Sequence, residues 1–499
     1  MIEGRAFGKN ASALYAHPLA SLPGGLPWLK PRERWMIMIR QFFASCVLLC
    51  VLAVPLRAVE VDASHIDPNP AKGTIFLSTR GFARTSSDAH NKGLEAATLH
   101  RQEFPYGAAA GWKWVYQGFS DGTKDTITIK GAGVWIQQTP GDALVRLPLT
   151  FNGGASNVVL AKDALQETDP ISTEIKPGAV VWVTTWYCTG APTTGLPFQT
   201  FLCVRESKPG LEDQDGVAAG PVGSLPDLTL KGGFQHKGLA LTAGQPYCCR
   251  GYQPMGAVGL PSPAFHGAEI VPFFIGDSIN VQYIDVYDDK TVYSMRGWNG
   301  RFCASKYPYM IFGQGGASSD GFWGTVKSPL FKYILGDNGA RQRKVTHLFN
   351  EYGINEIRLH KTPGDIATFE WSMRQKVAVI AHSYGLPYIQ STLMPCEAPL
   401  TLWNKPSDEN TANFATFVAQ RQVFNNMVRT QSDEAHLPGC VGFWGPCTAV
   451  ETDWKNGNNQ WVKGYRTDGI HPGSAGHVAA AATISPELLE NHSNPVPTQ

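Results

Sequence analysis

The chain has 499 residues, which is enough for two or three domains and a large hydrophobic core. Its 42 lysine and arginine residues nearly balance 41 aspartate and glutamate residues, so no long-range field favours binding to nucleic acid or to an anionic membrane. Charged residues make up only 17%, whereas glycine, proline and tryptophan are plentiful. This composition is typical of a folded, loop-rich extracellular protein and argues against a disordered chain or a coiled coil.

A targeting signal is predicted some distance from the first residue. Arg40 precedes an apolar stretch at 42–54, and residues 56–58 end in an alanine suited to cleavage. A basic flank, a short apolar core and a small terminal residue describe a secretory signal peptide. The core is short for a membrane span, and an uncleaved anchor is the alternative. We expect a signal peptide at 36–58 after an upstream extension at 1–35, and a secreted or periplasmic mature protein without a membrane span.

The cysteines predict disulfides rather than a metal site. Eight cysteines lie outside the signal, and an even number in an exported chain favours disulfide bonds. The chain has no CxxC pair and its histidines do not cluster at ligand spacing, so we expect no structural zinc. Cys440 and Cys447 flank a loop rich in glycine, proline and tryptophan, which a disulfide between them would close. The eight are Cys188, Cys203, Cys248, Cys249, Cys303, Cys396, Cys440 and Cys447.

Residues 59–265 are predicted to form a β-rich N-terminal domain of the sandwich or jelly-roll kind. Strand-like runs alternate there with turn signals, and helical periodicity is almost absent. Such a domain is either a structural appendage or a carbohydrate-binding module. The predicted strands include residues 126–130, 144–147, 180–187 and 227–231.

The sequence pattern changes after residues 256–263, a glycine- and proline-rich stretch that we interpret as a linker. Residues 266–499 alternate short apolar runs with amphipathic helical patterns, which predicts a parallel, doubly wound α/β sheet. The predicted strands lie at 270–275, 309–312, 344–349 and 388–394, and the predicted helices at 320–335, 365–384, 412–428 and 475–482.

Acyl transfer requires a nucleophile, a base, a group that orients the base and donors for the oxyanion. Ser278 follows a predicted buried strand, at the strand end where functional side chains of open α/β sheets gather. His471 is the candidate base, because imidazole shuttles protons near neutral pH. Asp468, three residues earlier, is close enough in the chain to orient the ring. Gly316 offers a backbone N–H and Asn355 a side-chain amide N–H to the oxyanion, beside the N–H of Ser278.

These residues lie in four blocks whose order resembles that of the SGNH hydrolases, the superfamily of GDSL-like esterases and lipases. The resemblance covers residues 270–482. It differs from the usual pattern at Ile279 and Glu356, neither of which carries the chemistry, and Gly315 is an alternative donor to Gly316. The blocks are Gly276–Ile279, Gly315–Ser318, Gly353–Glu356 and Asp468–His471.

The resemblance implies a flavodoxin-like SGNH hydrolase fold for residues 266–499 and a serine esterase that needs no metal or organic cofactor. It also implies the roles of the residues. Ser278 is the nucleophile, His471 the base and Asp468 its partner, and Gly316 and Asn355 are oxyanion donors.

A second serine must be weighed against Ser278. Ala381–Gly385 resembles the nucleophile elbow of α/β-hydrolases, with Ser383 as nucleophile and 377–380 as the strand that feeds it. The elbow must open a helix, whereas Pro387 and a strand-like run follow almost at once. We therefore expect Ser278, and not Ser383, to be the nucleophile.

The chain between Ser278 and Gly316 gives an indication of the substrate. A pocket for a long acyl chain is lined mainly by aliphatic groups, whereas this segment is aromatic and polar, as suits contact with sugar rings. We expect hydrolysis of short acyl esters, acetyl above all, on a glycan. The alternatives are a long-chain lipase and a non-catalytic carbohydrate-binding protein. The residues concerned are Tyr283, Asp285, Tyr287, Asp288, Asp289, Tyr293, Arg296, Trp298 and Asn299.

Overall fold

A computed structural model provides the fold of the chain. It describes residues 74–121, 123–198, 200–201, 215–232, 250–281, 297–304, 306–313, 315, 317–319, 328–336, 343–359, 366–396, 411–455, 459–466 and 470–492. The predicted signal peptide and the extension before it lie outside these ranges, as do Cys203, Cys248, Cys249, Gly316 and Asp468.

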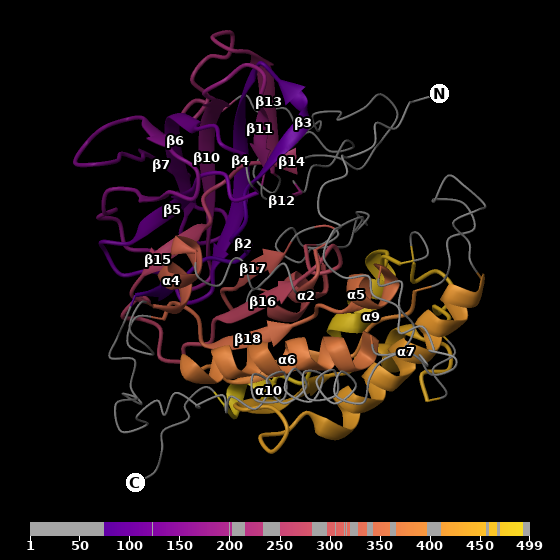
Figure 1. The fold of residues 1–499 in the computed structure, drawn as a ribbon. Helices are drawn as coiled ribbons and strands as arrows, with labels where there is room; N and C mark the ends of the chain where they lie inside the picture. Colours follow the sequence, from indigo (N-terminus) through magenta and orange to yellow (C-terminus); the bar gives the residue numbers. More distant parts are fainter. Residues whose placement is uncertain are drawn as a thin grey trace, which may run out of the picture. The chain divides into compact units, whose positions relative to one another are not determined.

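A six-stranded sheet, parallel throughout, forms the centre of the C-terminal half (Figure 1). Its order is β2-β17-β16-β18-β19-β20. The five strands from β16 to β20 therefore stand in the order 2-1-3-4-5, which is the flavodoxin-like order. Four of these five strands match predicted ones, whereas β20 was not predicted. The bounds are β2 Gly81–Phe82, β16 Pro272–Gly276, β17 Met310–Gly313, β18 His347–Asn350, β19 Tyr388–Ser391 and β20 Cys440–Trp444.

Helices cover both faces of this sheet. Successive side chains of a strand point to opposite faces. Phe274 of β16 packs edge-on against Trp298 of α2, with ring centroids 5.1 Å apart, while Phe273 packs against Phe331 of α4 at 5.8 Å. The sheet is therefore doubly wound, as predicted.

Four of the described helices match predicted ones, with α4 at the described end of the pattern at 320–335, whereas α2, α5, α8 and α10 were not predicted. The long helices α6 and α7 correspond to the patterns at 365–384 and 412–428, and α9 to the pattern at 475–482. The bounds are α2 Gly297–Cys303, α4 Pro329–Leu335, α5 Ile354–Leu359, α6 Ile366–Ser383, α7 Thr411–Gln431, α8 Cys447–Val450, α9 Ser474–Ala481 and α10 Glu487–Glu490.

The N-terminal half is built from antiparallel strands. A six-stranded sheet has the order β13-β4-β10-β6-β7, with β8 beside β6, and a four-stranded sheet has the order β1-β15-β5-β9. Tyr116 of β5 shares a 3.0 Å hydrogen bond with Thr185 of β10, so the two sheets contact each other. The principal strands are β4 Leu94–Phe104, β5 Lys113–Gln117, β6 Ile127–Gln137, β7 Val145–Pro148, β8 Val158–Leu160, β9 Leu165–Glu167, β10 Ala179–Thr189 and β13 Gly216–Pro221.

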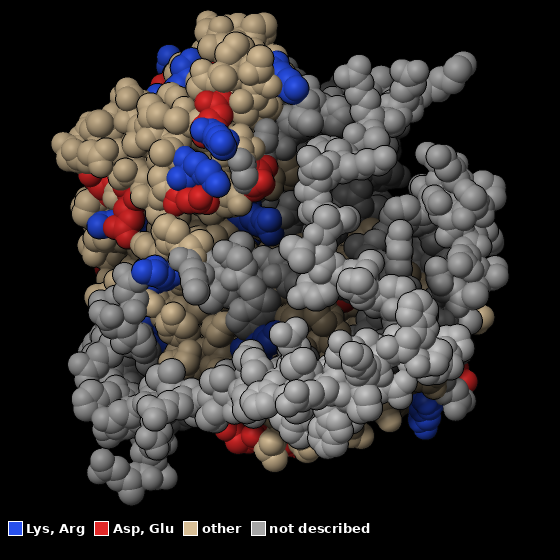
Figure 2. Space-filling view, in the orientation of Figure 1, with Lys and Arg blue, Asp and Glu red and all other residues tan. Residues whose placement is uncertain are grey.

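Shorter strands complete this half. β3 pairs with β11 and β12 pairs with β14 in two-stranded sheets. In the view of Figure 2, basic and acidic side chains are interspersed over the described surface of the N-terminal half. The bounds are β1 Ile75–Phe76, β3 Ser86–Lys92, β11 Gly195–Phe198, β12 Thr200–Phe201, β14 Arg250–Gly251 and β15 Gly256–Gly259.

Two local predictions for this half are wrong. The stretch interpreted as a linker contains β15, whose residues pair with β1 on one side and β5 on the other. Residues 227–231 form a loop and a turn instead of a strand. Both errors have one cause, because strand formation depends on a partner that local composition does not reveal.

The N-terminal half also supplies a strand to the parallel sheet. β2 pairs in parallel with β17, so the predicted boundary at residue 265 does not separate the two sets of strands completely. Within the described ranges, no helix has both the length and the apolar character needed to cross a membrane.

Candidate active site

Ser278 lies in a tight turn directly after the central strand β16. The carboxylate of Asp277 accepts a 2.9 Å hydrogen bond from the Ile279 N–H, and the Val281 N–H reaches back to the Asp277 carbonyl at 3.1 Å. β16 and β18 flank the point at which the strand order reverses, where ligands bind in open α/β sheets. The serine therefore stands at the edge of the sheet predicted for it, with 8% of its surface exposed.

His471 meets Ser278 across the site. Its Nε2 atom lies 2.8 Å from the Ser278 Oγ atom, which is hydrogen-bonding distance. The histidine is 9% exposed and lies just before α9. When Nε2 carries no proton, it accepts the hydroxyl hydrogen of Ser278, as a general base must.

Of the other three predicted site residues, the structure describes only Asn355. Asp468 and Gly316 lie outside the described residues, so their roles stay predictions. Asn355 lies in the first turn of α5, where its side-chain amide donates to the Ala317 carbonyl at 2.9 Å and to Asp277 at 3.2 Å. An oxyanion would have to replace one of these two acceptors, because the amide has only two hydrogens.

The geometry of Ser383 rules out the alternative nucleophile. Ser383 is the last residue of α6, its side chain is exposed, and its hydroxyl donates to the Ile380 carbonyl at 2.7 Å. The stretch 377–380, proposed as the feeding strand, belongs to the same helix. A nucleophile elbow needs a strand before the serine and a helix after it, which is the reverse of this arrangement.

A buried network of charged groups supports the loops around Ser278. Arg374 pairs with Glu370 at 3.0 Å, one turn apart on α6, and donates to the carbonyls of Asn350 and Tyr352 at the end of β18. Glu370 also accepts a 2.9 Å hydrogen bond from the hydroxyl of Ser319. The network ties α6 to the segments that follow β17 and β18.

Two glutamates of this network have shifted pKa values. Burial and the neighbouring charge of Glu356 raise the pKa of Glu370 to about 8. Burial also raises the pKa of Glu356, whose carboxylate accepts a hydrogen bond from the Ser319 N–H. Sequence reasoning missed this network, although an arginine four residues after a glutamate on a predicted helix was a readable signal.

Two residues expected to face a sugar belong to the core. Trp298 is fully buried between Phe274 and Trp444, with the two tryptophan rings 4.0 Å apart. Asn299 is also fully buried and donates to the backbone carbonyl of Asn280 at 2.8 Å. The other residues named from this segment lie outside the described ranges.

The predicted disulfides are absent among the described cysteines. Cys440 belongs to β20 and its thiol donates to the Gly442 carbonyl at 3.5 Å, while the thiol of Cys447 in α8 donates to the Leu393 carbonyl at 2.8 Å. The expectation of a bond between them is wrong, because each thiol packs separately in the core. Cys188, Cys303 and Cys396 are also buried.

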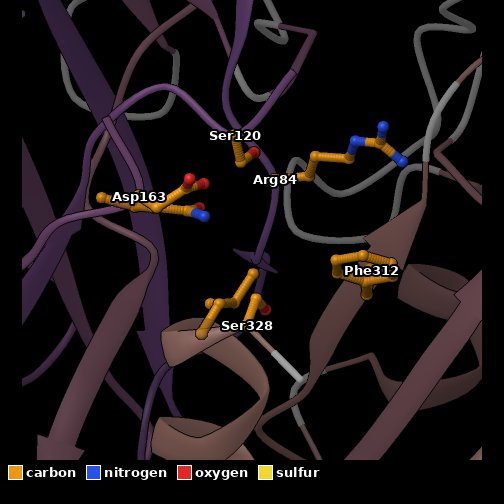
Figure 3. Close-up of a pocket in the computed structure, with 7 residues that line it drawn as sticks. Arg84, Ser120, Asp163, Phe312 and Ser328 are labelled. Carbon is orange, nitrogen blue, oxygen red and sulfur yellow. The ribbon is translucent and has the colours of Figure 1, made fainter. Parts of the chain in front are cut away.

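A small hollow is visible beside β17 in Figure 3, lined by residues that include Arg84, Asp163 and Ser328. Its volume is about 30 Å³, which is room for a water molecule and far too little for a sugar ring. Neither Ser278 nor His471 lines it. In the described part of the chain, no group of three or more metal-binding side chains is arranged around a common point.

Comparison with known proteins gives structural similarities only. No family model and no curated protein sequence matches the chain significantly. The solved structures similar to it include a structure described as an acylhydrolase, a GDSL-like lipase and esterases. A GDSL-like lipase of Bacteroides thetaiotaomicron is 15% identical with a TM-score of 0.29, over 44% of this chain and 88% of that one.

Two further structures come from carbohydrate esterases. A catalytic mutant of an acetylxylan esterase of Geobacillus stearothermophilus is 11% identical with a TM-score of 0.28, over 45% of this chain and 95% of that one. A carbohydrate acetylesterase of Sinorhizobium meliloti is 15% identical with a TM-score of 0.27, over 42% and 94%. Similarities of this size carry no argument about activity, so function must be argued from the residues of this chain.

Proposed function

We propose that this protein is a serine esterase of the SGNH type that removes short acyl groups, acetyl above all, from a glycan. The observation that carries the proposal is the 2.8 Å contact between Ser278 Oγ and His471 Nε2 at the carboxyl end of β16. The two residues come from distant parts of the chain and meet where a flavodoxin-like sheet binds its ligands.

The reaction follows from this pair. Ser278 Oγ attacks the ester carbonyl carbon while its proton passes to His471 Nε2, and the imidazolium then protonates the departing alkoxide. The alcohol leaves and the acyl group remains on Ser278. Water attacks the acyl carbonyl as His471 again takes a proton, and this proton returns to Ser278 Oγ when the acid departs.

Three further roles belong to the proposal. Asp468 orients the imidazole and stabilises its protonated form. The N–H groups of Ser278 and Gly316 and the amide of Asn355 bind the oxyanion. The choice of a glycan rests on the aromatic and polar residues of the segment after Ser278, among them Tyr283, Tyr287 and Tyr293.

Export forms part of the same proposal. A glycan outside the cell is within reach only of an exported enzyme, and residues 36–58 have the composition of a signal peptide. The mature protein should therefore begin near Val59, which N-terminal sequencing of protein from the exported fraction would test.

The decisive experiment uses p-nitrophenyl acetate with and without a serine-reactive phosphonate. The wild-type chain should hydrolyse the ester, the phosphonate should abolish hydrolysis, and peptide mapping should find the label on Ser278. Ser278→Ala should be inactive, whereas Ser383→Ala is the matched control and should retain most activity. A label on Ser383, or full activity of Ser278→Ala, would refute the assignment.

A second experiment tests the acyl group. The kcat/KM value should fall steeply from acetyl to octanoyl p-nitrophenyl esters, and acetate should be released from an acetylated polysaccharide. A preference for octanoyl or longer esters, without acetate release from any acetylated glycan, would instead support a lipase.

A further inference from the structure

Arg84 lies just past the edge strand of the parallel sheet, at the same level as the loop that carries Ser278. It follows the edge strand β2, and the Ala83 N–H still bonds to the Ile311 carbonyl of β17 at 2.8 Å, so the parallel register continues past the strand. In that register Arg84 stands in one row with Gly313 and with Gly276, the last residue before Asp277 and Ser278. The row follows from the pairs Gly81↔Met310, Phe82↔Ile311 and Gly276↔Gly313.

The Arg84 side chain points along the edge of the sheet. Its guanidinium carbon lies 5.9 Å from the centre of the Phe312 ring, and Figure 3 shows the guanidinium directed away from Asp163. Its charge acts on the hydroxyl of Tyr352, which follows β18 on the far side of β16. The strand register and this electrostatic influence together place Arg84 at the carboxyl ends of the central strands, where we propose that the ester binds.

This guanidinium is half-buried and has no hydrogen-bonding partner in the described structure. Its Nε atom is buried and makes no hydrogen bond, and burial lowers the pKa of Arg84. Tyr352 and Asp121 act on it electrostatically. Removing a cation from water without a partner is costly, and such groups gather at functional sites.

Two fully buried arginines of the chain each hold a carboxylate. Arg80, four residues earlier, holds Asp215 with two bonds of 2.9 and 2.7 Å. Arg421 holds Glu451 in the same way, at 3.1 and 2.7 Å. Arg84 differs from both because its acidic partner is missing from the described part of the protein.

We propose that Arg84 binds a carboxylate of the substrate, so that the acylated glycan contains acidic sugar units such as uronic acids. The planar guanidinium presents paired N–H donors that match the two oxygens of a carboxylate. This inference rests on the proposed esterase function and narrows its substrate class. It also explains why an unpaired cation is kept at this edge of the sheet.

Binding can be measured independently of ester hydrolysis. In the full-length Ser278→Ala protein, titration calorimetry should detect oligogalacturonate and find much weaker binding of neutral xylo-oligosaccharides. In the same Ser278→Ala background, Arg84→Gln should weaken the binding of oligogalacturonate about tenfold or more, because the charge-assisted hydrogen bonds to the carboxylate are lost. Arg84→Met, which keeps an apolar chain over Phe312, should have the same effect. Arg146→Gln removes an exposed arginine of the N-terminal half and serves as the control, with unchanged binding.

The active enzyme gives a second readout. Acetate release from acetylated polygalacturonate should exceed release from acetylxylan, and Arg84→Gln should lower this ratio of kcat/KM values about tenfold. Equal binding of both oligosaccharides, no binding of oligogalacturonate, or unchanged affinity in both Arg84 variants would overturn the inference. Failure of the wild-type chain to hydrolyse p-nitrophenyl acetate would instead refute the esterase proposal, and the binding data would still decide the role of Arg84.

Discussion

The carboxyl group of Glu351 lies against the start of the loop that carries the nucleophile and accepts a hydrogen bond from the Asp277 N–H at 3.4 Å. Glu351 follows β18 directly, whereas Asp277 follows β16, so the contact joins the ends of two neighbouring strands. A Cβ atom on Gly276 would overlap the same carboxyl oxygen of Glu351. The position of Ser278 therefore depends on a glycine at 276 and on the charge state of Glu351.

Glu351 should be neutral when the enzyme is active. Burial and then the charge of Asp277 raise its pKa well above the usual range, with Glu356 acting in the same direction and Arg374 opposing it. In wild type, activity should decline at alkaline pH as Glu351 ionises next to Asp277. Glu351→Gln is neutral at every pH, so its pH profile of kcat/KM for p-nitrophenyl acetate should lose this alkaline decline. Identical profiles for the two proteins would exclude Glu351 as a positioning residue.

Gly276→Ala should disturb the same contact from the other side. The added methyl group meets the carboxyl group of Glu351, and overpacking of this kind typically costs about 1–3 kcal/mol. We expect lower thermal stability and lower kcat. Shortening the opposing side chain in Gly276→Ala/Glu351→Ala should cost less than the sum of the two single changes. Strict additivity in thermal unfolding would show that the two positions do not interact.

Asn355→Ala separates an oxyanion role from a purely structural one. Loss of an oxyanion donor lowers kcat by roughly 10²–10³, with little change in KM, because the donor acts on charge that develops in the transition state. Loss of the bonds to Ala317 and Asp277 alone would lower stability instead. Steady-state kinetics together with thermal unfolding would decide, and a destabilised variant with near-normal kcat would remove Asn355 from the oxyanion site.

Glu370 should make the stability of the protein dependent on pH. Its folded-state pKa is raised from 4.5 to about 8, so its contribution to stability is complete below pH 4.5 and is lost as the pH rises to about 8. Glu370→Gln removes this titration while keeping an acceptor for Arg374. The free energy of unfolding should therefore fall less between pH 5 and 8 in the variant than in wild type. Parallel curves for the two proteins would contradict the raised pKa.

The five described cysteines should resist alkylation in the native protein. They are Cys188, Cys303, Cys396, Cys440 and Cys447, and all five are buried. Burial raises the pKa of the Cys440 thiol to about 12, and a thiol that stays protonated and inaccessible reacts slowly. Iodoacetamide followed by peptide mapping should label these five only after unfolding. Labelling of Cys440 or Cys447 at the rate of an exposed thiol would show that the core opens there.

The amino-acid sequence by itself determined four of the five strands from β16 to β20, the long helices of the α/β half and the candidate pair Ser278 and His471. Apolar runs such as 270–275 and helical periodicity such as that of α6 are local properties of the chain, and the chain order of the four blocks can be read directly. Only the tertiary structure decided that β2 joins the parallel sheet and that β15 replaces the expected linker. It also decided that Trp298 is buried, that Cys440 and Cys447 stay apart, and that Glu351 reaches the loop of Ser278. Each of these facts depends on a contact between distant segments, and local composition does not specify which segments will meet.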